Sequence, residues 1–502
     1  MAELLLVPFV FLLVGGILSY AVGRLELLYK KRLLAGTVAF LFFLLALVMQ
    51  VYVGLQVWQG SAVTTTVGGT LLRMDALSVF LSLVALTLGT AVCLYSIVYM
   101  KDDAGQEYYY LLLALMVAGI LGLSMATDFF VLYLFFELMS IPSYALVAFR
   151  RQDGMAVEAG VKYLVMSAVG SVIAVFGISL IYIQTGTLAF SSLLGTVQDV
   201  LVLQTAIVFL IIGFGVKAAI VPLHTWLPDA HSAAPSGISA MLSGIVIGAG
   251  FFTLMRSLLV FTGTGIPTGE ILIILSLLTM TVGNIMAFSQ LSREQIDLKR
   301  ILAYSSVAQM GYIILGVGVG MAYGIRTGYE GGLFHLMTHA FMKGLAFLCA
   351  GAMIHHVGTR YLNEMQGIGF SMKVTGFTLS LALLSLAGVP PLSGFMSEWL
   401  VFSSAITTYS VIGWVGILVA VIALANGLIS LGYYLPIIRK LYLSPKEEEK
   451  ARIMGAHDPS MVMLAAILFL AALTIILGVW PELGLRTIKP AVDALLSLGG
   501  GL

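Results

Sequence analysis

Fourteen apolar segments recur along the chain, and each is about long enough to cross a lipid bilayer. They run roughly over residues 3–22, 33–55, 76–100, 108–126, 128–148, 161–184, 203–221, 236–261, 268–290, 300–324, 331–357, 371–402, 411–438 and 460–480. A helical crossing takes about 20 apolar residues. Backbone groups inside the bilayer must bond to one another, so only helices or closed barrels can cross it, and the alternation of a barrel is absent. We expect an all-α integral membrane protein with about 14 transmembrane helices.

The composition excludes most soluble functions. Of the 502 residues, 60% are hydrophobic and only 10% are charged, whereas about 25% are charged in soluble domains. A soluble enzyme or a nucleic-acid-binding protein would need more polar surface. The net charge of +1 points to no charged partner. The two cysteines, Cys93 and Cys349, lie in apolar segments and are expected to be small buried side chains rather than a disulfide or metal pair. The first residues include Glu3 and lack a basic region, so no cleavable signal peptide is expected.

The basic residues are divided unequally between the two sets of connections. Connections after odd-numbered segments hold eighteen of the 25 Lys and Arg residues: Arg24, Lys30, Lys31, Arg32, Lys101, Arg150, Arg151, Lys162, Arg293, Lys299, Arg300, Arg360, Lys373, Arg439, Lys440, Lys446, Lys450 and Arg452. The other set holds five: Arg73, Arg256, Arg326, Arg486 and Lys489. Basic connections stay in the cytoplasm. We therefore expect a multi-pass protein of the cell membrane with both termini outside.

Four charged residues fall inside the apolar segments: Glu137, Lys217, Lys343 and Glu398. Each charge at the bilayer centre costs roughly 2.5–3.5 kcal/mol. Such groups face one another or water, and they mark ion paths by default. Glu137 is expected about 13 Å along its helix from Asp128, near the middle of the membrane. A purely structural ion pair between helices is the alternative for Glu137.

Lys217 lies beside an expected helix break. Pro222 and Pro228 follow it in VKAAIVPLHTWLPDAH, and proline removes a backbone donor and clashes with the preceding turn. Irregular backbone at membrane depth survives only where it lines a cavity or is buried in protein. The pattern indicates a hydrated ion site. The alternative is a lysine that only satisfies the carbonyl groups of a broken helix.

A second break is expected in SLAGVPPLSGFMSEW. Gly388, Pro390, Pro391 and Gly394 interrupt segment 12, and Glu398 follows them. The first break lies in segment 7. Interrupted helices at corresponding places in two halves are typical of internally repeated transporters.

Segment 11 carries a polar row. His335, His339 and Lys343 have the spacing i, i+4, i+8 and share one helix face. Histidine titrates near neutral pH, so the row is interpreted as a proton relay. Packing of neutral histidines is the main alternative. A haem or metal site is a weaker one, because no opposing pair of histidines is found.

Weaker signals lie near segment ends. His224, Asp229 and His231 follow the first break and are candidates for proton entry from the cytoplasm. Lys299 and Arg300 open segment 10 and are interpreted as ordinary anchors at the membrane surface.

Several long motifs give a specific resemblance. VKAAIVPLHTWLPDAHSAAPSGISAMLSG, FFELMSIPSYAL, LKRILAYSSVAQMGYI, LFHLMTHAFMKGLAFLCAG and AGVPPLSGFMSEW resemble the motifs of the antiporter-like membrane subunits. These subunits are shared by respiratory complex I, Mrp-type multisubunit Na+/H+ antiporters and membrane-bound hydrogenases. The resemblance implies helices 4–8 and 9–13 as inverted repeats, each with a proton half-channel, joined by a polar axis. The chain would then divide into residues 1–100 (helices 1–3), 108–261 and 268–438 (the repeats), and 460–502 (helix 14 and tail).

The resemblance also assigns residue roles. Glu137 corresponds to the helix-5 glutamate that pairs with the helix-7 lysine, here Lys217. His335, His339 and Lys343 match the helix-11 relay, and Glu398 matches the helix-12 site, where the family has either Lys or Glu.

One position departs from the family pattern. Where family members usually present Lys or His on helix 8, this chain has Gly248. Arg256 lies about 12 Å further along the helix, too far to substitute.

Together these features predict a proton-translocating subunit of a multisubunit complex. The complex would be of the Mrp antiporter, membrane-bound hydrogenase or sulfane reductase, or complex I type. The expected partners are other membrane subunits, the lipid bilayer and H+, with Na+ as a second candidate ion and no nucleic acid. No cofactor is expected in this chain, so it would hold no catalytic site, and redox chemistry would belong to partner subunits. SSVAQMGYIILG favours the Mrp and hydrogenase branch. The alternatives are a stand-alone Na+/H+ antiporter and a structural subunit with vestigial conduction.

Overall fold

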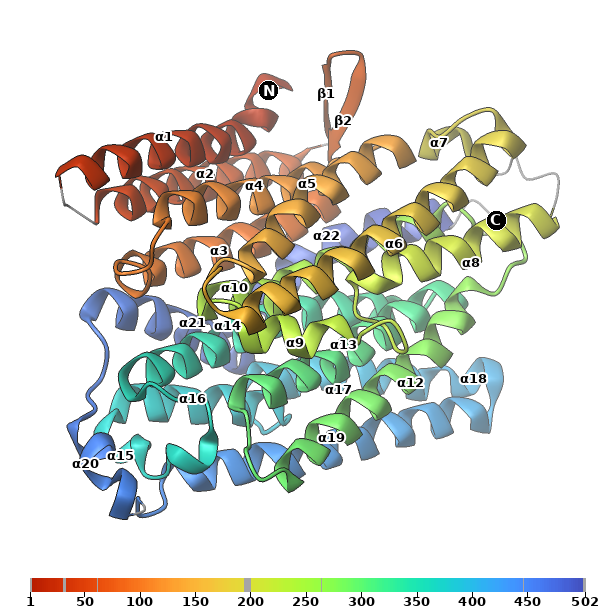
Figure 1. Ribbon diagram of the computed structural model, residues 1–502. Coiled ribbons are helices and arrows are strands. Elements are labelled where there is room, and N and C mark those ends of the chain that lie inside the picture. The colour runs from red at the N-terminus through yellow and green to blue at the C-terminus, as the bar shows by residue number, and fades with distance from the viewer. Residues whose placement is uncertain are drawn as a thin grey trace.

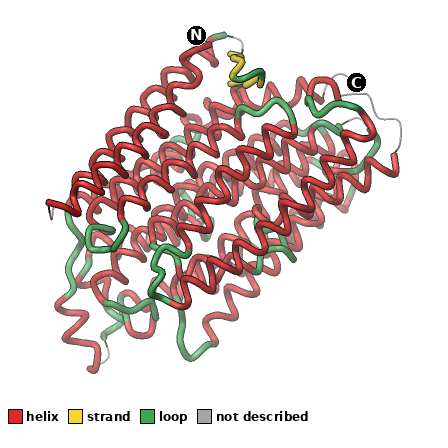
Figure 2. Tube along the Cα trace, turned by 45° about the horizontal axis from the view of Figure 1, so that its top comes forward, coloured by secondary structure: helices red, strands yellow, loops and turns green. Residues whose placement is uncertain are grey.

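The computed structural model describes residues 2–29, 33–60, 62–193, 200–262, 264–445 and 447–499. Its helices run side by side in one bundle (Figures 1 and 2). Twelve helical runs in the described chain are long and apolar enough to cross a membrane. They are α1 (Val7–Tyr29), α2 (Leu34–Gln59), α3 (Ala76–Tyr99), α4 (Gln106–Ser124), α5 (Phe129–Val147), α6 (Gly154–Thr185), the continuous run of α10 (Ser236–Met241), the π-helical turn η2 (Leu242–Val246) and α11 (Ile247–Leu259), then α12 (Thr268–Ser289), α13 (Leu298–Tyr323), α14 (Arg326–Val357), α19 (Trp414–Leu441) and α21 (Met461–Val479).

Two further segments are built from shorter helices. Segment 7 forms α8 (Val200–Lys217) and α9 (Trp226–Ala233), and segment 12 forms α16 (Lys373–Leu386) and α17 (Ser393–Thr407). The predicted interruptions are therefore present in both places. The all-helical membrane architecture expected from the sequence is confirmed.

Helix boundaries follow simple local rules. Asp75, Asp128, Asp153 and Asp297 each precede a helix, and each carboxylate accepts a hydrogen bond from a backbone N–H of the first turn. A side-chain oxygen at this position satisfies a donor that the helix itself leaves free. Asp128 thereby separates α4 from α5 across the very short connection that the sequence predicts.

The helices differ in how deeply they lie in the bundle. Those of the centre, α3, α10 to α11, α13 and α14, are buried over most of their length. The outer helices α1, α2, α6 and α19 carry many exposed Leu, Val and Ile side chains. A bilayer accommodates such apolar faces, whereas water would not. Among the buried charged residues, Lys217 lies on α8, which packs against α11, and Lys343 lies on α14 itself.

Both termini lie at the same end of the bundle (Figures 1 and 2). A hairpin of β1 (Val63–Val67) and β2 (Thr70–Met74) lies at this end too. Gly68 and Gly69 both have positive φ in its two-residue turn, as such tight turns require. The sequence analysis predicted no strand here, because two five-residue strands between long apolar segments give little periodic signal.

The C-terminal tail is also helical. It forms α22 (Glu482–Gly499), which packs against α3 and α14 with Ile488, Ala491 and Val492 buried. The sequence analysis described this region only as a tail, because its apolar residues occupy one face and no long run.

The opposite end of the bundle collects the basic connections. Arg150 binds Asp103, Arg360 binds Asp297, and Arg452 of the surface helix α20 (Glu447–Gly455) binds Glu449. Lys30, Lys31, Arg32 and Lys446, also assigned to this side, lie outside the described residues. Short elements complete the fold: η1 (Ala2–Leu6), α7 (Phe190–Leu193), η3 (Gln290–Ser292), η4 (Leu362–Glu364), α15 (Ile368–Ser371) and α18 (Tyr409–Ile412).

The start of α16, the first half of the second broken helix, is capped by a carboxylate from much later in the chain. The contribution of this cap to the stability of the protein can be tested. Asp458 accepts hydrogen bonds from the backbone N–H groups of Val374 and Thr375, at 3.1 and 2.9 Å, at the start of α16. We expect Asp458→Ala to lower stability by about 1–2 kcal/mol, as loss of an N-terminal cap does. Cys93 and Cys349 are free and buried, so the temperature at which they react with a maleimide reports unfolding.

The matched control is Glu448→Ala, which removes an exposed carboxylate from α20. It should leave that temperature unchanged. An Asp458→Ala protein as heat-resistant as the Glu448→Ala control would contradict the capping role.

Candidate functional site

The backbone of the first broken helix is stabilised by side chains from its neighbours. After Lys217, the last residue of α8, the chain is non-helical until Trp226. The Trp226 indole donates to the carbonyl of Val216 at 2.8 Å, and the N–H of Val221 donates to Thr279 Oγ1 at 3.2 Å. These bonds satisfy backbone groups that the break leaves open, as a dry interior requires.

The position of the prolines corrects one prediction. Pro222 lies in the non-helical segment, as expected, but Pro228 does not interrupt a helix. It is the third residue of α9, and in a first turn the missing N–H has no helical partner in any case. Pro390 and Pro391 lie between α16 and α17, as predicted.

Lys217 is buried beside a hydroxyl group and an aromatic ring. Its side chain is 1% exposed. The ammonium donates to Ser143 Oγ at 3.1 Å and lies 4.4 Å from the centre of the Tyr163 ring. Tyr163 in turn shares a 2.9 Å hydrogen bond with Ser143 and stacks on Trp226 at 3.8 Å. The lysine is thus held by a hydroxyl and an aromatic face, which attracts a cation.

Glu137 lies near Lys217 but does not touch it. The half-buried carboxylate accepts a hydrogen bond from Ser171 Oγ. In the described part of the chain, neither Lys217 nor Lys343 forms an ion pair with a carboxylate. Ser143, six residues after Glu137 on α5, makes the contact that the sequence analysis assigned to Glu137. A serine in an apolar segment is too common to be predicted as a lysine partner.

The polar row of α14 has the arrangement that its spacing predicts. His335, His339 and Lys343 are all at most 1% exposed, and the two imidazole rings are 6.3 Å apart. His335 bonds through both nitrogens, to Ser397 Oγ at 2.9 Å and Gln309 Oε1 at 2.8 Å. His339 Nε2 has no partner among the described residues.

Lys343 repeats the environment of Lys217. Its ammonium donates to Ser305 Oγ, and to the carbonyl of Leu302 at 3.0 Å. It also lies 6.0 Å from the centre of the Tyr434 ring. Lys217 and Lys343 therefore each have a serine hydroxyl and a tyrosine ring as neighbours, in the two halves of the chain.

Glu398 lies beside the second break. It is 4% exposed, and Gln309 is next to its carboxyl group. Gln309 also donates to the carbonyl of Leu386, where α16 ends, at 3.1 Å. Gln309 thus connects His335, Glu398 and the broken helix. The sequence analysis missed this residue, because one amide in a helix carries no distinctive pattern.

The three entry candidates differ in their surroundings. Asp229 is half-buried and binds both Lys162, at 3.1 Å, and Arg300. These three side chains line a charged cavity of about 240 Å³ at the basic end of the bundle. His224 is 8% exposed and lies in the break.

His231 lies deeper than Asp229. It is fully buried and stacks on Phe347 at 4.8 Å, and neither ring nitrogen has a partner among the described residues. Lys299 and Lys343 are both close enough to act on it electrostatically.

Lys299 was wrongly interpreted as a surface anchor. It is only 4% exposed, and its ammonium donates to the carbonyl of Ala234 at 2.6 Å. This carbonyl ends α9, where the helix dipole favours a cation. Lys299 is the second residue of α13, a deeply buried helix that packs against α9. Arg300 does lie nearer the surface.

The run from α10 to α11 separates the two lysines and is apolar at the expected bridging position. A methyl group on Gly248 would lie 3.5 Å from Leu336 Cγ, and one on Gly250 would lie 3.0 Å from Lys217 Cβ. Ser243 in the π-helical turn shares a 2.6 Å hydrogen bond with Ser306, next to the partner of Lys343. Arg256 binds Asp75 at 3.5 Å and the carbonyl of Ser124 at 2.9 Å instead of either lysine's neighbours.

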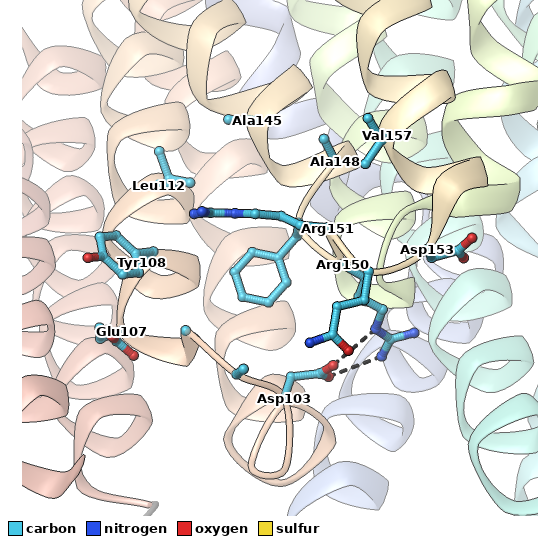
Figure 3. A pocket seen from close by; sticks show the side chains of 14 residues that line it. Asp103, Glu107, Tyr108, Leu112, Ala145, Ala148, Arg150, Arg151, Asp153 and Val157 are labelled. Atoms are coloured by element: carbon cyan, nitrogen blue, oxygen red, sulfur yellow. Dashed lines mark hydrogen bonds and ion pairs between the residues drawn. The ribbon is translucent and has the colours of Figure 1, made fainter.

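A larger cavity than the charged one lies elsewhere. It has a volume of about 1130 Å³ and opens at the basic end between α4, α5 and α6 (Figure 3). Arg150 makes two 3.1 Å bonds to Asp103 there. Burial alone would lower the pKa of the Arg150 guanidinium, but the bonds with Asp103 and the neighbouring Tyr99 raise it overall. None of the predicted site residues lines this cavity.

No metal-binding cluster is found in the described ranges: no three His, Cys, Asp or Glu side chains there are placed to hold an ion.

Fold and site together define a helical membrane protein with two broken helices beside two buried lysines. A family model described as the transmembrane part of "NADH:quinone oxidoreductase/Mrp antiporter" matches residues 126–425, more than half of the chain. A second, described as the N-terminus of complex I chain 5, matches residues 69–110. The chain therefore belongs to the family of antiporter-like membrane subunits of complex I and Mrp antiporters.

Relatives of known name agree with this assignment. The chain is 32% identical to F(420)H(2) dehydrogenase subunit N of Methanosarcina mazei over 444 residues, 86% of each protein. It is 36% identical to NADH-quinone oxidoreductase subunit N of Desulfitobacterium hafniense over 405 residues, 76% of this chain and 77% of that one. Its fold is similar to a chain of the membrane-bound sulfane sulfur reductase, an archaeal respiratory complex, with a TM-score of 0.86, 24% identity and 98% coverage of both.

The packing of Glu398 against the second break gives a further test. Gly388 has φ of +69°, and a methyl group on it would lie 2.5 Å from Glu398 Oε2. We expect Gly388→Ala to lower stability by at least about 1 kcal/mol, because the left-handed backbone disfavours a side chain and the carboxyl group must move. The temperature at which the buried Cys93 and Cys349 react with a maleimide measures this loss of stability.

Gly427 on α19 is the matched control. A methyl group there meets only the Tyr312 hydroxyl, at 3.8 Å, and alanine also favours the helix. Gly427→Ala should therefore be neutral or mildly stabilising. Equal stability of both variants would contradict the described contact at Gly388.

Proposed function

We propose that this chain is a proton-translocating subunit of a multisubunit membrane complex. One observation carries the proposal: Lys217 and Lys343 are buried in the bundle, have no carboxylate in contact among the described residues, and are held by serine hydroxyls. A buried amine without a counter-ion is costly when charged. Its protonation therefore depends on charges that move nearby, which is what a pump needs.

Protons would enter from the basic end of the bundle. The charged cavity around Lys162, Asp229 and Arg300 is open to that side, and His231 lies behind it with two unbonded ring nitrogens. Unsatisfied buried polar groups are commonly bonded to ordered water. The route would pass from this cavity through water to His231. His224, in the break, would serve as a second acceptor.

Glu137 and Lys217 would act as a charge switch through Ser143. In the proposed cycle, ionised Glu137 favours protonated Lys217, and neutralising Glu137 favours release of the lysine proton. Ser143 lies within hydrogen-bonding reach of Lys217 and follows Glu137 on the same helix. Because Glu137 does not hold Lys217 directly, the pair can separate or approach without breaking an ion pair.

The second half of the route would run along α14. Since Gly248 offers no bridging side chain, the serine pair Ser243–Ser306 and water near His231 would connect the halves. From Lys343 the proton would pass His339 and His335 to Glu398, with Gln309 positioning His335 through its 2.8 Å hydrogen bond. Exit would be on the side opposite the basic connections.

The architecture proposed for this function has fourteen membrane crossings. Residues 108–261 and 268–438 would be two five-helix inverted repeats, each with one broken helix, flanked by residues 1–100 and 460–502. With basic connections in the cytoplasm, both termini would lie outside. Other membrane subunits would complete the complex, and any redox cofactor would be bound by partners rather than by this chain.

A structural role with vestigial conduction is the second candidate. Gly248 favours it, since this glycine packs against Leu336 and supplies no titratable side chain at the position where the family usually has Lys or His. A stand-alone Na+/H+ antiporter is the remaining candidate. The purified chain alone in liposomes would then exchange Na+ for H+, whereas the proposed subunit would not.

Replacing Lys217 tests the proposed function. We expect Lys217→Ala to abolish proton pumping by the complex in proteoliposomes while the complex assembles normally, because the switch loses its titrating group. Acidification inside the vesicles, followed with a pH-sensitive dye, is the measurement.

The control for this variant is Lys489→Ala. Lys489 is partly exposed and binds Glu482 at the surface, so pumping should continue. Normal pumping by the Lys217→Ala complex would refute the mechanism and favour the structural role.

His231 provides an independent test of the route. We expect His231→Phe to keep the stacking on Phe347 but to slow pumping at least tenfold, since proton transfer by a positioned group contributes about 10²–10⁴-fold. His457→Phe, at an exposed position of the loop before α21, should pump at the normal rate. Equal pumping rates in the two variants would show that His231 is not part of the proton route.

A further inference from the structure

A third cavity opens on the outer surface of the bundle between α17 and α19. We call it the lateral cavity; its volume is about 530 Å³, within the range of sites for drug-sized ligands. Glu398 is the only ionisable side chain in its lining. Apart from the Trp399 indole, the remaining lining side chains are apolar. The cavity is therefore an apolar chamber with one carboxyl group at its inner wall.

The mouth of the lateral cavity faces outward through apolar side chains. Trp399 is 57% exposed, Leu424 53% and Leu428 64%. These residues belong to helices that we treat as membrane-spanning, so the mouth opens toward lipid acyl chains. A ligand would then enter sideways from the bilayer and not from water.

The chemistry of the lining restricts the ligand. A metal ion is unsuited, because Na+, Mg²⁺ and Ca²⁺ need several oxygen ligands and the lining side chains supply one carboxyl group. An anion would meet like charge. A carboxylate accepts hydrogen bonds and pairs best with an N–H donor that carries positive charge. The walls, by contrast, favour a hydrocarbon chain.

We propose that the lateral cavity binds a lipophilic amine. The uncharged amine dissolves in the bilayer and enters through the mouth between α17 and α19. When Glu398 carries its proton, the carboxyl O–H bond breaks and a new N–H bond forms at the amine nitrogen. The result is an ammonium paired with the Glu398 carboxylate, with the hydrocarbon chain along Leu424 and Leu428.

The occupied cavity would also block Glu398 as a proton acceptor. This consequence rests on the proposed function, but binding itself does not. Binding is therefore the property to measure, and its failure is distinguishable from a failure of proton transport.

Photolabelling of the intact complex tests the proposal. The complex is placed in phosphatidylcholine nanodiscs with a long-chain N,N-dimethylamine that carries a diazirine in its alkyl chain. Labelled peptides are then mapped by mass spectrometry. We expect label on α17 and α19 around the lateral cavity, displaced by unlabelled amine. The alcohol of the same chain length should label there at least about tenfold less, because it cannot form the ion pair.

Two variants test separately the contribution of the carboxyl group and that of the cavity volume. Glu398→Gln should weaken labelling by the amine at least about tenfold. Gly427→Leu should do the same with Glu398 intact, because Gly427 lines the cavity and has room for a side chain. Val415→Leu, at an exposed position of α19 outside the cavity, should label like the unmodified chain.

Three results would overturn the proposal. Labelling that survives Glu398→Gln, or equal labelling by the alcohol, would show a merely apolar site. Label spread evenly over the outer helices would show no site. Absence of label from α17 and α19 would show that another subunit covers this face.

Discussion

A protonated amine inside a bilayer is stable only if polar groups replace the water it has lost, and two such amines lie in the centre of this protein. Lys217 and Lys343 each have a serine hydroxyl and a tyrosine ring as neighbours, without a touching carboxylate among the described residues. The same constraint applies to the helix breaks in the seventh and twelfth segments, whose backbone groups have also lost water. Irregular backbone at membrane depth needs partners, which Trp226, Thr279 and Gln309 provide. The polar site and the interrupted helices thus depend on each other.

The centre of the bundle shows how closely the two halves approach. Small residues bring the run from α10 to α11 against both lysine-bearing helices, with Gly250 at Lys217 and Gly244 at the backbone of α14. Close packing leaves no room for a long side chain, and Gly248 contributes to that packing. A polar contact is found nearby in the π-helical turn, where Ser243 and Ser306 share a hydrogen bond. A proton that crossed between the halves would need hydroxyl groups and water.

Much of this arrangement could be predicted from the sequence, because charges and prolines are rare in apolar segments and therefore informative. Lys217, Lys343, Glu398 and both breaks were found in this way, as was the shared face of His335 and His339. The partners were not: Ser143, Tyr163 and Gln309 are ordinary residues whose role depends on which helices meet. Lys299 was misjudged for the same reason, since burial at a helix start depends on the neighbouring α9. The prediction for Pro228 was wrong because proline breaks a helix in its interior but is tolerated in its first turn, where Pro228 lies.

The named relatives include subunits of an F(420)H(2) dehydrogenase and of an NADH-quinone oxidoreductase, and the present chain is similar to each over about three quarters or more of its length. The account therefore depends on proton exchange at the buried lysines and not on any particular redox partner. Lys217→Arg tests this directly, because arginine keeps the charge and the hydrogen-bond donors but does not release its proton. The measurement is the number of protons pumped per turnover by the complex in proteoliposomes. The account predicts that pumping is lost while the complex remains assembled. An unchanged number of protons per turnover would contradict it.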